Sequence, residues 1–166
     1  VFQLLKLLCE FKKPLVAAVP GLAIGIGTTL LLHCDLVYAS DTAKFKMPFV
    51  DLGLVPEAGS SQLLVQLMGH QRAAELLLLG EAFDADRALA LGIVNQVVAQ
   101  TELLSLARAK AAQLASKPTN ALIASKALMK RAPEPLWQRM QLEAKLFSEA
   151  LNSPEAKAAF ARFLSK

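Results

Sequence analysis

The sequence predicts an α/β fold followed by a helical lobe. Up to about residue 100, short apolar runs typical of buried strands alternate with segments whose apolar residues recur at helical spacing. From Thr101 onward the pattern is helical, with breaks at Pro118 and at the proline-containing segments 133–135 and 152–154. Hydrophobic residues make up 54% of the 166 residues and charged residues 19%, which suffices for a packed core. We therefore expect an α/β core over residues 1–100 and a helical lobe over residues 101–166.

The first part of the chain alternates helix and strand. FQLLKLLCEF has apolar residues at helical spacing and stops before Pro14, and LVAAVP (15–20) is typical of a buried strand. The segment Gly25–Cys34 predicts a buried helix, and DLVYAS (35–40) predicts a second strand. In AKFKMP (43–48) apolar and polar residues alternate, as in a half-buried strand.

Glycines then mark a loop and several shorter elements. The loop FVDLGLVPEAGSS opens a helix that Ser60 or Ser61 can cap and that Gly69 ends. The next helix, HQRAAELLLL, ends at Gly80. DADRALA predicts a short helix with Asp84 as its N-cap, and IVNQVV predicts a strand.

Several function classes are disfavoured by what the sequence lacks. No apolar run is long enough to span a bilayer, and the opening VFQLLKLLCEFKKP has no signal-peptide pattern. Because the chain starts within a helical pattern and without Met, we expect that residues precede Val1 in the complete protein. Cys9 and Cys34 have no metal-ligand or redox spacing, so we expect two buried, reduced thiols, no metal and a cytoplasmic location.

The net charge of +4 is unevenly distributed. Residues 1–100 hold 7 Lys/Arg and 9 Asp/Glu (−2), whereas residues 101–166 hold 11 and 5 (+6). A basic helical lobe suits a phosphorylated small ligand, a nucleic acid or a membrane surface, and it can also be an ordinary solvated face. No Lys/Arg run is interleaved with aromatic residues, so we expect no nucleic-acid partner, and we expect no membrane partner either.

The stretch VPGLAIGIGTTLLLHCDLVYAS, residues 19–40, joins a strand to a helix through three glycines. A dinucleotide fingerprint needs a third glycine where Leu30 stands, and a P-loop needs Gly-Lys-Ser/Thr. Both motifs are absent. A helix that starts at Gly25–Gly27 leaves backbone N–H groups that can stabilise negative charge on a substrate oxygen. Close packing of the helix against the strand is the alternative explanation for the glycines.

The order of motifs resembles the crotonase (enoyl-CoA hydratase/isomerase) superfamily. KPLVAAVPGLAIGIG at Lys13–Gly27 is similar to the family's glycine-rich segment, and similar elements follow at Cys34–Ala39, Ala43–Pro48 and Ala88–Val98. The resemblance implies the C-terminal part of a ClpP/crotonase-like ββα spiral, followed by a helical trimerisation lobe. It also implies an acyl-CoA thioester substrate, a role in fatty acid metabolism and no further cofactor.

Two departures from the family pattern bear on the chemistry. Crotonase hydratases carry catalytic glutamates at the positions that Thr29 and Phe49 occupy here. A single carboxylate, Glu57, stands in LGLVPEAGSS, a context similar to that of the Δ3,Δ2-enoyl-CoA isomerase branch; Asp51 is a weaker alternative base. The resemblance implies Glu57 as the catalytic base and the Ile26 N–H as an oxyanion donor. It implies substrate contacts at Ala23, Ile24, Gly25, Phe49 and Pro56.

The C-terminal helices also resemble those of the family, which pack in a homotrimer or a dimer of trimers. Phe163 and Lys166 have the Phe-x-x-Lys spacing that implies a contact with coenzyme A. The chain ends in LSK rather than in the peroxisomal SKL. Isomerisation is the leading prediction. Hydratase-like chemistry, isomerisation of an epoxy-acyl-CoA, and a non-catalytic binding module remain alternatives.

Overall fold

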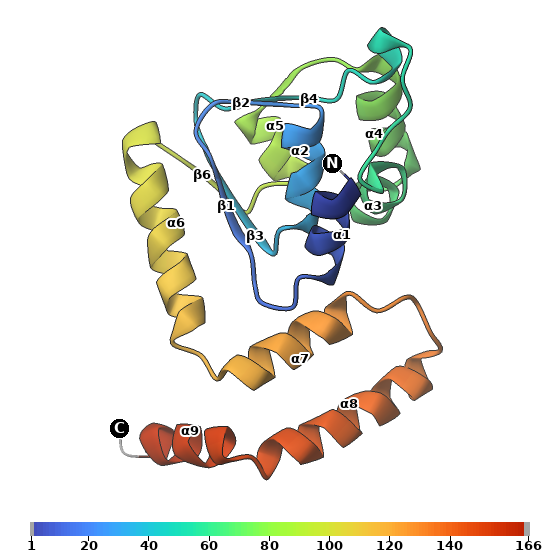
Figure 1. Cartoon of the computed structure of the whole chain (residues 1–166). Coiled ribbons are helices and arrows are strands. Elements are labelled where there is room, and N and C mark those ends of the chain that lie inside the picture. Colours follow the sequence, from blue (N-terminus) through green and yellow to red (C-terminus); the bar gives the residue numbers. More distant parts are fainter. Residues whose placement is uncertain (1, 165–166) are drawn as a thin grey trace. The chain divides into compact units, whose positions relative to one another are not determined.

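The computed structural model describes residues 2–164, which form two compact units (Figure 1). The first unit contains helix α1 (Phe2–Glu10) and the chain from Leu15 to Ala111. The second contains Lys12–Pro14 and the chain from Ala112 onward. Helix α6 (Gln100–Ala115) runs from the first unit into the second. The expected boundary at residue 100 between an α/β core and a helical lobe stays a prediction.

A three-stranded parallel sheet lies at the centre of the first unit. Its strand order is β1 (Val16–Val19), β3 (Leu36–Ser40) and β6 (Gln96–Val98). Side chains alternate across β3, because successive strand residues point to opposite faces. Val37 and Ala39 belong to the main core, whereas Tyr38 packs with Leu103 and Ala107 of α6. Both faces of the sheet are therefore covered, as parallel sheets require.

A second, smaller sheet adjoins the glycine-rich turn. It contains β2 (Leu22–Ile24), β4 (Lys44–Lys46) and β5 (Phe83–Asp84), with β2 parallel and β5 antiparallel to β4. The expected half-buried strand at 43–48 is confirmed by β4, in which Phe45 is fully buried and Lys44 is exposed. The sequence pattern did not predict β2, because three residues between Gly21 and Gly25 are too few to establish an alternation.

The helices of the first unit follow the sequence expectations with local differences. The predicted helix at 25–34 is α2 (Ile26–Thr29) continued by the 3-10 helix η1 (Leu30–His33). Beyond the 3-10 turn η2 (Val50–Leu52) lie α3 (Ser60–Met68), α4 (His70–Ala74), the π-helix η3 (Glu75–Leu79) and α5 (Ala85–Ala90). The predicted cap at Asp84 is confirmed, because its carboxylate accepts the Arg87 N–H at 2.8 Å. The predicted serine cap of α3 is wrong: Gly59 is the N-cap, at φ +69°, and no side chain of the described residues caps this helix.

The second unit is helical, with α7 (Thr119–Met129), α8 (Leu136–Leu151) and α9 (Pro154–Leu164). The Lys126 ammonium donates to the Lys13 carbonyl at 2.7 Å, which ties the segment 12–14 to α7. Arg139 of α8 donates to Glu134 at 2.5 Å and to the Leu128 carbonyl at 3.2 Å. This arginine therefore links the start of α8 to the end of α7 and to the turn between them.

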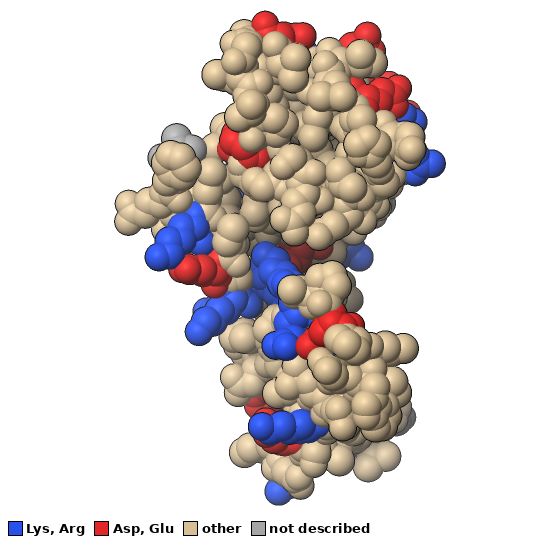
Figure 2. Space-filling model, turned by 90° about the vertical axis from the view of Figure 1, so that its right-hand side faces the viewer, with Lys and Arg blue, Asp and Glu red and all other residues tan. Residues whose placement is uncertain are grey.

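The structure also shows where the charged side chains and the two cysteines lie. On the face in Figure 2, basic and acidic side chains are interspersed with wide uncharged areas. The expectation of two buried thiols is wrong, since Cys9 is exposed and Cys34 is half-buried. Across residues 2–164, no group of three or more His, Cys, Asp or Glu is placed to hold a metal ion. No helix within the same residues has the length and apolar character needed to cross a membrane.

Candidate functional site

Two parallel strands of the smaller sheet end at the candidate site. β2 leads directly into the turn at Gly25, and β4 leads through η2 into the loop that carries Glu57. The Gly25 N–H donates to the Lys46 carbonyl at 2.8 Å, which extends the pairing of the two strands to their carboxyl ends. Segments that follow neighbouring parallel strands emerge at the same edge of a sheet. The sheet therefore brings the start of α2 and the Glu57 loop together.

Gly25 gives this turn its shape. Its backbone has φ +57° and ψ −119°, a combination that is essentially restricted to glycine. Ile26 follows as the first residue of α2, so its N–H has no acceptor within the helix. Among the described residues no other hydrogen bond is recorded for this N–H. The turn thus presents a backbone donor where the helix dipole also favours negative charge.

Glu57 is the carboxylate that the tertiary structure brings to this turn. The Thr29 hydroxyl, at the end of α2, donates a hydrogen bond to Glu57 Oε1. Thr29 is fully buried, and Glu57 is half-buried. Glu57 Oε2 is also buried, yet it has no hydrogen-bond partner within residues 2–164. A carboxylate with one oxygen held and the other unpartnered is suited to accept a proton from a bound molecule.

The backbone beside Glu57 is held by a second contact from the same helical segment. His33 Nε2 lies 2.8 Å from the Ala58 carbonyl oxygen. Because a carbonyl only accepts, Nε2 carries a proton, and Nδ1 lies 3.9 Å from the Cys9 sulfur. Ala58 has φ +54°, a left-handed conformation that is unfavourable for a residue with a Cβ. The histidine therefore anchors a strained turn.

The remaining predicted site residues have different surroundings. Ala23 is buried in β2, whereas Ile24, the last residue of that strand, is 50% exposed. Phe49 is buried in the main core, which favours a packing role; its substrate contact stays a prediction. Pro56 is half-buried beside Glu57. Asp51 pairs with Lys46 at 3.2 Å on the surface and has no recorded contact with Thr29 or Glu57.

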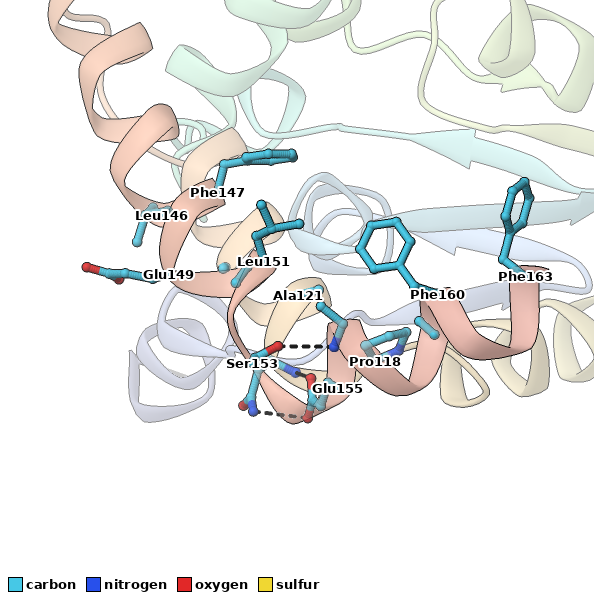
Figure 3. Close-up of a pocket in the computed structure, with 15 residues that line it drawn as sticks. Pro118, Ala121, Leu146, Phe147, Glu149, Leu151, Ser153, Glu155, Phe160 and Phe163 are labelled. Atoms are coloured by element: carbon cyan, nitrogen blue, oxygen red, sulfur yellow. Dashed lines mark hydrogen bonds between the residues drawn. The ribbon is translucent and has the colours of Figure 1, made fainter. Parts of the chain in front are cut away.

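Phe163 lies on α9 in the second unit, where it lines an apolar cavity of about 760 Å³ together with Phe147, Leu151 and Phe160 (Figure 3). Asn120 and Glu155 also line this cavity, and the Asn120 side-chain amide donates to Glu155 at 3.0 Å, joining α7 to α9. Lys166, the other residue expected to contact coenzyme A, lies outside the described residues. The contact of these two residues with coenzyme A stays a prediction.

Sequence reasoning missed the roles of Thr29 and His33. From the sequence, Thr29 was noted only because hydratases have a glutamate at that position, and no role was predicted for His33. The two residues are four apart, so they lie on one face of the helical segment and contact the consecutive residues Glu57 and Ala58. The available signal was the i, i+4 spacing of Thr29 and His33 in a helical segment whose only other polar side chain is that of Thr28.

Comparisons with known proteins give consistent results. A family model described as enoyl-CoA hydratase/isomerase matches residues 1–166. A protein of Clostridium acetobutylicum named a short-chain-enoyl-CoA hydratase is 34% identical over 167 residues, covering 100% of this chain and 63% of its own length.

Solved structures agree with that match. One from Magnetospirillum magneticum AMB-1 is 48% identical with a TM-score of 0.96 and covers 99% of this chain. An enoyl-CoA hydratase subunit from Geobacillus kaustophilus HTA426 is 41% identical, with a TM-score of 0.92 and 99% coverage. This chain spans 65% and 64% of those two chains. The predicted crotonase-type α/β fold is thereby confirmed.

Proposed function

Since the chain belongs to the enoyl-CoA hydratase/isomerase family, we propose that it moves the double bond of a 3-enoyl-CoA to the 2-position, with Glu57 as the only base. The observation that carries this proposal is the hydrogen bonding of the two carboxylate oxygens of Glu57. Oε1 of Glu57 is held by Thr29, and Oε2 is buried without a partner among the described residues. Thr29 and Phe49 occupy the two positions where the hydratase pattern has glutamates, which favours a reaction that needs one base.

The proposed reaction is a proton transfer in two steps. Glu57 Oε2 removes a proton from C2 of the 3-enoyl thioester, and the electrons of that C–H bond form a dienolate with its charge on the thioester oxygen. The Ile26 N–H donates to this oxygen, where such a donor is worth about 10²–10³ in rate. The protonated Glu57 then returns the proton to C4. The double bond now lies between C2 and C3, and the carboxylate is regenerated.

The surroundings of Glu57 suit an acyl group. Leu52 at the end of η2 and Leu54 and Val55 in the loop precede it, and each is more than half exposed. Exposed apolar side chains beside a reactive carboxylate favour contact with an apolar ligand. The large exposed side chains of α8 and α9, such as Phe147 and Phe160, likewise support the proposal of a homotrimer or a dimer of trimers.

The test is conversion of 3-hexenoyl-CoA to 2-hexenoyl-CoA by the intact protein, followed by chromatography of the thioesters. Glu57→Gln keeps the shape of the side chain and removes the base, so kcat should fall about 10²–10⁴-fold. Glu81→Gln is the matched control, because Glu81 is an exposed glutamate of the same unit. It should stay within about twofold of wild type, as surface changes usually do. Equal rates for wild type and Glu57→Gln would refute Glu57 as the base.

A second candidate function is hydration of a 2-enoyl-CoA, which is favoured by the name of the Clostridium acetobutylicum relative. Hydration needs a group that activates water and a group that delivers a proton to C2. The same samples distinguish the two reactions, because hydration yields a 3-hydroxyacyl-CoA. If this product forms from 2-hexenoyl-CoA faster than the double bond moves, hydration replaces isomerisation as the function.

A further inference from the structure

The Thr29 hydroxyl has a single proton, and its surroundings determine which acceptor receives it. Two oxygens lie near Thr29 Oγ1: Glu57 Oε1 and the Gly25 carbonyl oxygen, the latter at 3.4 Å. The Gly25 carbonyl already accepts the N–H groups of Thr28 at 2.9 Å and of Thr29 at 3.0 Å. A charged carboxylate is the stronger acceptor. The hydroxyl proton therefore points to Glu57.

This contact makes the two oxygens of the carboxylate inequivalent. Oε1 is engaged, and Oε2 is buried with no partner in the described part of the chain. We propose that Thr29 is a positioning residue that fixes the Glu57 carboxylate so that Oε2 alone takes and returns the proton. This inference rests on the proposed function, because it assigns a role to Thr29 only if Glu57 is the base.

Thr29 and His33 hold different parts of the Glu57 segment, the side chain and the backbone respectively. His33 fixes the backbone through the Ala58 carbonyl at 2.8 Å, but that contact leaves the side-chain torsions of Glu57 free. Thr29 is the residue that restrains the carboxylate itself. A fully buried threonine at the end of α2 is also a rigid donor, because its β-branched side chain has few rotamers. The site thus orients its base with a group that has no charge and does not titrate.

The contact also has a consequence within the reaction. After Oε2 has taken the C2 proton, Oε1 is the carbonyl oxygen of a neutral acid and still accepts the Thr29 hydroxyl. The acid is therefore kept from rotating, and the proton stays on the oxygen that delivers it to C4. Thr29 donates the same hydrogen bond in both steps and neither gains nor loses a proton, so its own charge does not change.

Two substitutions at Thr29 separate its hydroxyl from its methyl group. Thr29→Val keeps the shape and removes the hydroxyl, whereas Thr29→Ser keeps the hydroxyl and removes the methyl group. Loss of positioning should lower kcat of Thr29→Val about 10- to 100-fold, with KM within about threefold of wild type. Thr29→Ser should recover most of kcat, to within about threefold of wild type. If the role is only packing, the order reverses: valine retains activity and serine loses it.

Thr28→Val is the matched control. Thr28 is equally buried on the same helix, but its hydroxyl donates to the Ala23 carbonyl at 2.5 Å rather than to Glu57. Its kcat should exceed that of Thr29→Val by about tenfold or more. Equal losses would mean a general loosening of α2 and would overturn the proposal.

Glu57→Gln distinguishes this proposal from the function on which it rests. If Glu57→Gln is inactive while Thr29→Val keeps kcat within about twofold of wild type, the base stands and the positioning role is refuted. If Glu57→Gln is as active as wild type, the proposed function fails and the role of Thr29 fails with it.

Discussion

Alanine substitutions at Gly25 and Gly27 should have opposite effects on stability, although both glycines belong to the same motif. An alanine at Gly25 would have to adopt φ +57° and ψ −119°, at a cost of about 1–3 kcal/mol of unfolding free energy. Its Cβ would meet no atom of the described residues within 4 Å, so the cost comes from the backbone alone. At Gly27 the backbone is helical, and a Cβ would meet only that of Ala23, at 3.9 Å. Alanine there should stabilise by about 1 kcal/mol through helix propensity.

Thermal unfolding followed by circular dichroism measures both effects. For a chain of this length, the melting temperature should fall by roughly 2–12 °C in Gly25→Ala and rise by roughly 2–4 °C in Gly27→Ala. If Gly25→Ala relaxes its backbone instead, the Ile26 N–H turns away and the isomerisation rate should fall about 10²–10³-fold. A Gly25→Ala protein with the melting temperature and the kcat of wild type would refute the role assigned to this turn.

Two further predictions follow from local geometry. Ala58→Gly relieves the left-handed conformation at φ +54°. It should raise the unfolding free energy by about 0.5–1 kcal/mol, after subtraction of the extra conformational freedom that glycine has in the unfolded chain. Urea denaturation measures this, and unchanged or lower stability would contradict the prediction. Hydrogen bonds from Arg131 and then from Arg139 lower the pKa of Glu134 to about 2 from its usual 4.5. The cluster's contribution to stability is therefore complete above about pH 4.5 and is lost as the pH falls toward 2. Carbon-13 NMR titration of the Glu134 carboxyl checks this, and Arg139→Gln should move the midpoint to higher pH; an unchanged midpoint would exclude the arginine as a cause.

Much of the fold was predictable because its signals are local. The strands β1 and β3 follow from buried apolar runs, and the caps at Asp84 and Gly69 follow from residue type and position. The cap of α3 was not predictable in the same way. Serine is a favoured cap, but the left-handed backbone at Gly59 begins the helix one residue earlier and leaves the Ser60 hydroxyl buried and, among the described residues, without a partner.

For the candidate site, the sequence indicated the Gly25 motif and Glu57 but did not indicate that the two lie close together. The motif around Gly25 and the single Glu57 were identified from order and context, 32 positions apart along the chain. Their proximity depends on the parallel pairing of β2 with β4, and β2 is too short to be recognised from the sequence pattern. The exposure of Cys9 was not predictable from the sequence for a similar reason. It depends on what packs against α1 rather than on the residues next to Cys9 in the sequence.

By itself, the sequence predicted most of the helices and strands, the family resemblance and the carboxylate that we propose as the base. Only the tertiary structure decided that Thr29 holds one oxygen of Glu57 while the other has no partner within residues 2–164, and that His33 anchors the next peptide. The physical reason is the distance along the chain over which each interaction acts. Helix periodicity, turn residues and caps act over a few positions, whereas a hydrogen bond across 28 residues exists only after two strands have paired and placed both ends at one edge of a sheet.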